Sequence, residues 1–328
     1  MPISPDQIPG LTADLGLKFA AKAWGEIPEE YLRIARVMQA GECSDAPWGT
    51  IESSFSTNAV PLRRRDGAPI EEASVAEDYV RLGANRLFSR KMGITQRDTE
   101  GEAAQSQLVT KMKKFMLDFN VSAKLKRADL FANVLIKGSL TAGDADTFNN
   151  TYDNAARSDS YPKFIYDGAP FFGTHTAKHS GATYSNYGTQ TMGSAGLDAT
   201  RTLVNNTNAF DEAGRRIQIV ADTVIVPQGL EYTASQTVNS QKDPSTANGG
   251  SNPLQNRFEV FVLPQLADTD GWYCGVRGKG IVFIDGGTPS FESVWDPHTK
   301  TTWIIAEDRH GCFVDEWRYW AANRTPQS

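Results

Sequence analysis

The clearest pattern of apolar and polar positions lies between about Glu100 and Lys137. No proline interrupts this stretch, and its only glycine, Gly101, stands at the start. Apolar side chains recur at intervals of three and four residues, which is the period of one helix face. They are Leu108, Met112, Phe115, Phe119 and Ala123, and then Val121, Leu125, Ala128, Ala132 and Leu135. With Gly138 in a typical helix-ending position, the pattern predicts one helix, roughly 55 Å long if continuous.

The polar positions of this predicted helix are mostly basic. Lys111, Lys113, Lys114, Lys124, Lys126 and Arg127 fill its other faces. Asn120 and Ser122 are weak helix formers, so a kink near the middle is one expectation. A coiled coil is an alternative interpretation of so long a helix, but the heptad pattern is not kept strictly.

Two shorter segments with apolar periodicity come before it. They cover 15–24 and 28–38, and Pro28 suits the first position of a helix. Isolated helices of this length are marginally stable in water. We therefore expect both segments to dock on another surface, in this subunit or in a neighbouring one.

Residues 45–94 predict a long two-stranded ribbon with a charged tip. Residues 45–75 lack a helical period, and 78–94 are rich in strand formers. The three basic residues Arg63-Arg64-Arg65 are followed by the turn dipeptide Asp66-Gly67. Because a two-stranded ribbon is marginal alone, it needs a partner surface. The candidate inter-subunit contacts are Arg63, Arg64, Arg65, Glu71, Glu72 and Asp78. A phosphate contact and a solvated loop face are the alternatives for the three arginines.

The second half of the chain alternates loops with short elements. Helices are predicted at 197–210 and 230–238. A strand pair is predicted within 216–226, and single strands at 258–263, 280–284, 291–295, 301–306 and 312–317. Residues 139–196 are predicted to be mostly loop. The combination of a long helix with many strands indicates an α+β protein.

No catalytic or metal-binding group emerges from the residue types. His175 and His179 are four residues apart, but glycines flank them and no third ligand is near, which disfavours zinc. Residues 274–280 carry glycines in the wrong order for a dinucleotide site and predict a hairpin turn. Cys274 and Cys312 lie in strand-like runs, where buried structural thiols are usual. We therefore predict no enzyme, no cofactor and no metal.

Composition narrows the class of protein further. The chain has 328 residues, 33 of them basic and 39 acidic, for a formal net charge of −6. This charge gives no global basic surface for binding nucleic acid. No run of 18 apolar residues predicts a membrane span, and the start MPISPDQIPG does not look like a secretion signal. Three separated cysteines fit a reducing cytoplasm better than a disulfide scaffold.

Several stretches in the second half, in this order, resemble a known family. They are 166–172 with Gly173-Thr174-His175, 184–186, 210–217, 224–227, 229–231 with Ala234, 271–273 and 318–320. The chain resembles tailed-phage major capsid proteins of the Hong Kong 97-like fold, and it is most similar to the Mu-type major head subunits. The first 100 residues match in layout only.

The resemblance implies a division of the chain into parts. Residues 1–45 would be an N-terminal arm, 46–92 an extended β-hairpin loop, 93–139 the spine helix of a peripheral domain, 140–272 an axial domain, and 273–328 late strands that return to the peripheral domain.

The resemblance also implies a structural function. The chain would self-assemble as hexamers and pentamers into the icosahedral shell that encloses the double-stranded DNA of a tailed bacteriophage or prophage. Scaffold, portal and decoration proteins would be candidate partners, and no membrane contact is implied. Assembly would take place in the host bacterial cytoplasm. An acidic subunit would hold the DNA only loosely. The alternatives are a decoration or connector subunit and, more distantly, a cytoplasmic hydrolase.

Overall fold

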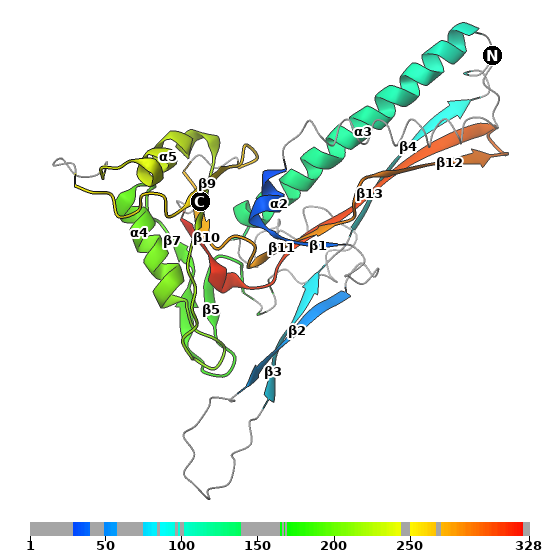
Figure 1. Ribbon diagram of the computed structural model, residues 1–328. Coiled ribbons are helices and arrows are strands. Elements are labelled where there is room, and N and C mark those ends of the chain that lie inside the picture. Colours follow the sequence, from blue (N-terminus) through cyan, green and yellow to red (C-terminus); the bar gives the residue numbers. More distant parts are fainter. Residues whose placement is uncertain are drawn as a thin grey trace, which may run out of the picture.

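The computed structural model describes residues 29–39, 49–57, 75–83, 86–95, 98, 102–138, 165, 167, 169–243, 250–266 and 270–323. In these residues two five-stranded β-sheets share a core, and a long helix lies along one of them (Figure 1). The predicted α+β class is confirmed. None of the helices in this part of the chain combines the length and the apolar character that a membrane crossing needs.

The first sheet is built on one long β-hairpin. Its strands are β1 (Arg36–Gln39), β11 (Ile281–Asp285), β13 (Thr301–Val314), β12 (Ser290–Asp296) and β4 (Arg86–Thr95). Strands β11 and β12 both pair antiparallel with β13, each along a different part of its length. The registers are Asp285↔His310 and Ser290↔Glu307. Strand β4 also pairs antiparallel with β13, and β1 pairs parallel with β11. The two strands predicted at 301–306 and 312–317 are therefore largely one strand, which ends at Val314.

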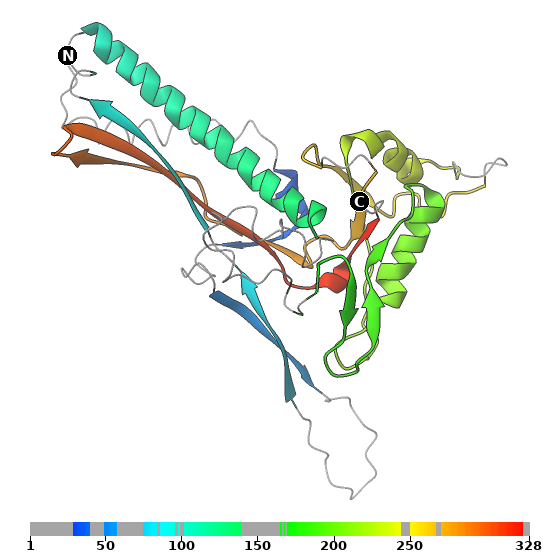
Figure 2. The ribbon, with the colours of Figure 1, turned by 180° about the vertical axis from the view of Figure 1, so that it is seen from behind.

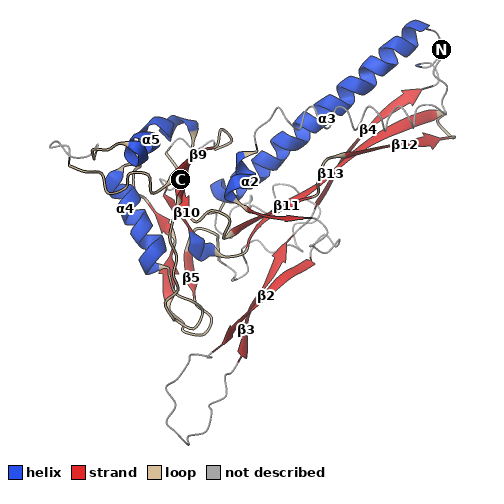
Figure 3. Ribbon diagram, viewed as in Figure 1, coloured by secondary structure: helices blue, strands red, loops and turns tan. Residues whose placement is uncertain are grey.

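The second sheet has buried central strands under two helices. Its order is β7 (Tyr187–Gly188), β14 (Trp320–Asn323), β10 (Trp272–Gly275), β8 (Thr223–Val226) and β9 (Glu259–Val262). Helix α4 (Ser194–Thr202) contacts β10, and α5 (Glu231–Asn239) contacts β8 and β9. A π-helix, Leu203–Thr207, extends α4, and a 3-10 turn, Gln228–Leu230, precedes α5. The small sheet of β5 (Thr174–Thr176) and β6 (Thr183–Ser185) lies in the same lobe (Figure 3).

The strand pair predicted within 216–226 is wrong in its first half. Only residues 223–226 form a strand. The amides before it are satisfied elsewhere: Ile217 donates to the carbonyl oxygen of Ala209, and Ala221 donates to Asn205 Oδ1 at 2.8 Å. An apolar alternation thus marks burial here without a sheet ladder.

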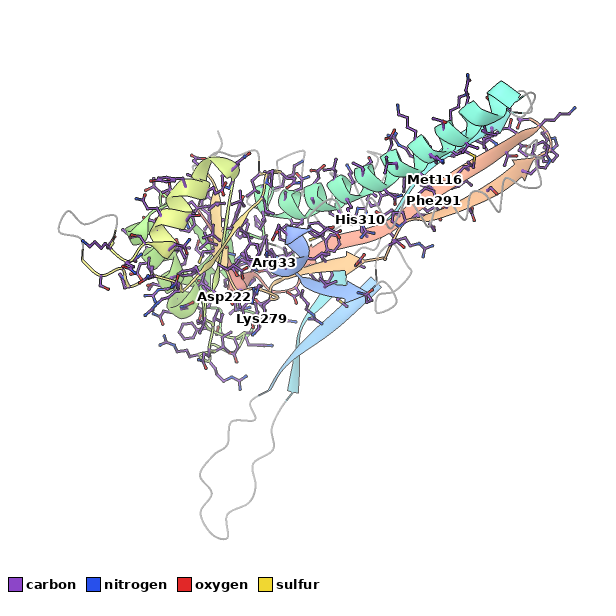
Figure 4. The ribbon with its side chains drawn as sticks, turned by 45° about the horizontal axis from the view of Figure 1, so that its top comes forward. Arg33, Met116, Asp222, Lys279, Phe291 and His310 are labelled. Carbon is purple, nitrogen blue, oxygen red and sulfur yellow. The ribbon has the colours of Figure 1, made fainter. Side chains whose placement is uncertain are left out.

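Helix α3 (Glu102–Ile136) confirms the predicted long helix without a break. Asn120 is fully buried, and its Nδ2 atom donates to the carbonyl oxygen of Met116 at 2.8 Å, within the helix. The buried face runs through Met112 and Met116 and leaves Phe115 and Phe119 half-buried. Figure 2 shows α3 lying along β4, β12 and β13, and Figure 4 shows Met116 and Phe291 between the helix and the sheet.

The segment 28–38 is not one helix. Helix α2 (Glu30–Ile34) ends where Ala35 turns extended, and the chain continues as β1 because its backbone bonds to β11. The segment 15–24 lies outside the described residues.

The predicted ribbon is present in part as β2 (Gly49–Thr57) paired antiparallel with β3 (Val75–Gly83). The ribbon projects away from both sheets (Figure 1). The following strand, β4, leaves the ribbon and joins the first sheet. Residues 86–92, which were expected in the extended loop, therefore belong to that sheet.

The hairpin predicted at 274–280 is also wrong, because β10 and β11 belong to different sheets. The connecting turn needs glycine twice: Gly278 has φ +69° and Gly280 has φ +81°. A Cβ atom on Gly278 would meet nothing within 4 Å, whereas one on Gly280 would lie 2.7 Å from both the Glu316 carbonyl oxygen and the Trp320 ring.

These two glycines give a matched test of the link between the sheets. We expect Gly278→Ala to destabilise the subunit by about 1–2 kcal/mol, the penalty of a left-handed backbone. Gly280→Ala adds a steric clash and should cost about 3 kcal/mol or more. Urea unfolding of unassembled subunits measures both. Gly229→Ala, at an exposed site with open space around it, is the control. Equal losses for the two variants would contradict the packing described here.

Candidate functional site

Four of the stretches that carry the family resemblance, 166–175, 184–186, 210–217 and 318–320, meet in space. We call their buried polar and aromatic side chains the junction cluster: Asp167, His175, Asn186, Glu212, Trp317, Arg318 and Trp320. The cluster lies where the segment after β13 crosses from the first sheet to the second. Its geometry shows whether the side chains do chemistry or hold the subunit together.

His175 is fully engaged within the cluster. Its Nδ1 atom lies 2.6 Å from Asp167 Oδ2, and its Nε2 atom lies 3.2 Å from the carbonyl oxygen of Phe171. The imidazole stacks on Trp317 with ring centroids 4.1 Å apart. Both nitrogens are thus used to position the ring, and in the described part of the chain no three His, Cys, Asp or Glu side chains are placed to hold a metal.

Asn186 ties three backbone segments together. Its Nδ2 atom donates to the carbonyl oxygens of Phe171 at 2.8 Å and Trp320 at 3.1 Å, and its Oδ1 atom accepts from the Gly173 amide at 2.9 Å. The side chain is completely buried. Because a buried amide must be fully hydrogen-bonded to be tolerated, Asn186 fixes the relative position of these segments.

Charged groups in the cluster are paired with each other. Arg318 donates to Glu212 Oε1 and to Glu316 Oε1, each at 2.8 Å. The other carboxylate oxygen of Glu212 accepts from the Lys178 amide at 2.7 Å. Paired in this way, these charges hold the loop after β5 and the segment after the π-helix to the segment after β13.

A second buried network joins α3 to the first sheet. Arg127 donates to Asp308 on β13, to Asp285 on β11 at 2.8 Å, and to the Gly287 carbonyl oxygen at 2.6 Å. Arg127 and Asp308 are 1% and 3% exposed. His310 Nδ1 lies 2.8 Å from the second oxygen of Asp308. Two of the basic side chains expected on the outer faces of the helix, Lys124 and Arg127, are therefore buried; Lys124 pairs with Glu29.

The electrostatics of this network favour a neutral His310 and a charged Asp308. Burial lowers the pKa of His310 below its ordinary value of 6.5, against the effect of Asp308. Burial acts to raise the pKa of Asp308, but hydrogen bonds from His310 and Arg127 hold it below its usual value. Since the carboxylate accepts, His310 Nδ1 carries the proton.

The thiols fit a structural role. Burial raises the pKa of the Cys274 and Cys312 thiols far above the usual range. A thiolate is the reactive form of cysteine, so neither side chain is an activated nucleophile.

The contact residues predicted from the sequence are not tested by this geometry. Arg63, Arg64, Arg65, Glu71 and Glu72 lie outside the described residues. Asp78 lies on β3, and its side chain is outside the described part. The sequence analysis did not identify Arg127 as a buried residue. Its position, four residues after Ala123 and four before Phe131, places it on the buried face of the helix and could have indicated this.

This architecture defines a class of protein. The chain is an α+β subunit with a long helix along a sheet, a projecting two-stranded ribbon and ionisable groups used in buried pairs, and its fold is the Hong Kong 97-like fold of phage capsid proteins. Residues 122–323 match the family described as phage capsid protein, and the chain belongs to that family.

The solved structure that supports the fold is a phage capsid, and a second is reported beside it for comparison. The capsid of Ralstonia phage GP4 aligns with a TM-score of 0.52 and 9% identity, covering 90% of this chain and 88% of that one. The capsid of Myoviridae phage XM1 aligns with a TM-score of 0.48 and 9% identity, covering 88% of each chain. A search of curated proteins finds no match to this sequence. The closer similarity to Mu-type head subunits stays a prediction.

Breaking the second network should destabilise the subunit strongly. Arg127→Met leaves the buried Asp308 and the half-buried Asp285 without their cation, so we expect a loss of about 3–5 kcal/mol in unfolding free energy. Thermal or urea unfolding of unassembled subunits measures it. Lys126→Met, at the adjacent exposed position, is the control and should change stability by less than about 1 kcal/mol. Comparable losses in both variants would show that the network contributes no special stability.

His310 should make the subunit acid-sensitive. Because its folded pKa is lowered, the unfolded chain binds more protons near and below pH 6.5, and stability falls as the pH drops through that value. The slope contributed is at most about 1.4 kcal/mol per pH unit. Unfolding at pH 7.5, 6.5 and 5.5 should show this slope in wild type and in His298→Phe, an exposed control, but a smaller slope in His310→Phe. An unchanged slope in His310→Phe would argue against the buried neutral imidazole.

Proposed function

We propose that this chain closes an icosahedral shell, as hexamers and pentamers of identical subunits, around the double-stranded DNA of a tailed bacteriophage or prophage. The observation that carries the proposal is the projecting β2–β3 ribbon on a body whose two sheets share one core. A ribbon of two strands cannot bury its own faces, so it needs the surface of another copy.

In this proposal each part of the chain has a place in the shell. Residues 1–45 act as the N-terminal arm and 46–85 as the extended loop that reaches a neighbour, while 86–92 lie in β4 of the first sheet. Within 93–139, α3 is the spine helix of the peripheral domain, and 140–272 form the axial domain with the second sheet. After residue 273 the chain returns through β11–β13 to the peripheral domain, and its last described strand, β14, lies in the second sheet.

The proposal extends to partners and place. A formal net charge of −6 per subunit would repel packaged DNA weakly and leave it free to be ejected. Scaffold, portal and decoration proteins are the other partners proposed, and assembly takes place in the host bacterial cytoplasm. We propose no enzymatic role: among the described residues, His175 is held by hydrogen bonds, and the pKa values of the Cys274 and Cys312 thiols are raised by burial.

The charged tip of the ribbon gives the test. Reversing Arg63, Arg64 and Arg65 to Glu should leave the subunit folded but prevent shell formation, because the tip would repel the acidic groups that it meets on a neighbour. Circular dichroism checks the fold, and electron microscopy of the purified protein, with a scaffold where one is needed, checks assembly.

The control makes the same change in formal charge elsewhere. Lys113→Glu, Lys114→Glu and Lys242→Glu alter exposed positions of α3 and the segment after α5, away from the ribbon. Normal particles from the arginine variant would show that the ribbon tip makes no contact that shell formation needs. Closed rings of one fixed copy number from the wild-type chain would favour a connector or decoration subunit instead.

A further inference from the structure

Helix α3 carries an apolar series that the first sheet does not cover. Leu117, Val121 and Leu125 follow at intervals of four residues, so they line one face of the helix. Leu125 is 46% exposed, Leu117 and Val121 are half-buried, and none of the three joins a hydrophobic cluster of the described residues. At about 3.6 residues per turn, Val121 is rotated by about 140° from the buried Met116. We call these three side chains the outer stripe.

The chain enters the described structure beside this stripe. Its first described residue, Glu29, accepts a hydrogen bond from the Tyr31 hydroxyl at 2.7 Å, and its other carboxylate oxygen lies 3.3 Å from Lys124 Nζ. The Lys124 side chain is 0% exposed, so this pair holds Glu29 against α3, where Figure 1 shows α2 beside the helix. Lys124 comes three residues after Val121, and positions three apart are neighbours on a helix surface. The residues before Glu29 therefore leave from a point next to the outer stripe.

The segment that precedes Glu29 has the pattern and the length to cover the stripe. Residues 15–24 lie outside the described residues, and their sequence predicts a short helix. Its apolar positions at intervals of three and four are Leu17, Ala20, Ala21 and Trp24. A helix of this length would be about 15 Å long, and the outer stripe extends over about 12 Å of α3.

The connection to Glu29 decides which copy supplies the segment. Only residues 25–28 lie between, and even when fully extended they keep Trp24 within about 18 Å of Glu29. A linker this short holds the segment near the stripe at an effective concentration in the millimolar range. The same segment of a second copy has no such advantage and would have to displace it.

We propose that residues 15–24 pack as a short helix on the outer stripe of α3 in the same subunit, with the Glu29–Lys124 pair as the anchor at the C-terminal end of the segment. The packing removes apolar surface from water on both sides, because so short a helix is marginal alone and Leu125 is nearly half exposed. The site belongs to the single subunit and goes beyond the proposed shell, so its test does not require assembly.

Photo-cross-linking of unassembled full-length subunits tests the position. Leu125→p-benzoylphenylalanine places a photoreactive ring at an exposed site in the stripe. Irradiation should join it to residues 15–24, which mass spectrometry of the digested product identifies. The control, Lys126→p-benzoylphenylalanine, lies on the side of α3 that faces β4 and should not reach the segment. Equal yields from the two positions, or no cross-link to 15–24 from position 125, would overturn the site.

The same cross-link identifies the copy. An equal mixture of unlabelled and heavy-isotope-labelled subunits is irradiated, and the isotopic label of both halves of each cross-linked peptide is read. Both halves should carry the same label, because they come from one chain. Pairs of mixed label would show that a second copy supplies the segment, and they would overturn the proposal.

A charge in the stripe should release the segment. Leu125→Glu should make trypsin cleave after Lys18 and Lys22 about tenfold faster than in wild type, because cleavage follows the population of the open segment. Leu87→Glu is the control: this leucine, on β4, is 50% exposed, and its variant should be cleaved at the wild-type rate. Circular dichroism checks that both variants fold. An unchanged rate in Leu125→Glu, or the same increase in both variants, would overturn the proposal.

Discussion

The fold depends on the burial of Arg127 between Asp285 and Asp308. A guanidinium in the interior is tolerated only when its charge and its donors are matched. Arg127 finds these partners on β11 and β13, and this pairing fixes the position of α3 along its axis. Apolar contacts alone, such as those of Met112 and Met116, would permit sliding by a turn. The ion pairs therefore select the register of the long helix, and the hydrophobic stripe supplies most of the contact area.

The junction cluster has the corresponding role between the two sheets. Asn186 and the Glu212–Arg318 pair connect segments far apart in sequence, and Trp317 and Trp320 fill the space between them. The carboxylates, the Asn186 amide and the Arg318 Nη atoms of the cluster are hydrogen-bonded to one another or to backbone groups. In a shell subunit such a network is useful, because the strain of assembly can fall on the projecting parts while the two sheets keep their arrangement.

The sequence predicted the elements whose pattern is local. The 3–4 spacing and the absence of proline identified α3 to within two residues at its start, and dense apolar runs located β9 and β11. It failed where long-range pairing overrides local preference. Residues 36–39 continue a helical pattern yet form β1, because β11 offers a free edge, and the glycines of 274–280 serve a crossing between sheets and not a hairpin.

The sequence alone determined the family, through an order of short motifs, and the long helix, through its periodicity. Only the tertiary structure brings residues of those motifs together. Asp167, His175 and Arg318 are separated by up to about 150 residues, and no local pattern reveals that they share one buried cluster. It also decided the roles of Arg127 and His310. A basic residue on a helix is solvated or buried according to what faces it, and that partner lies on a distant strand.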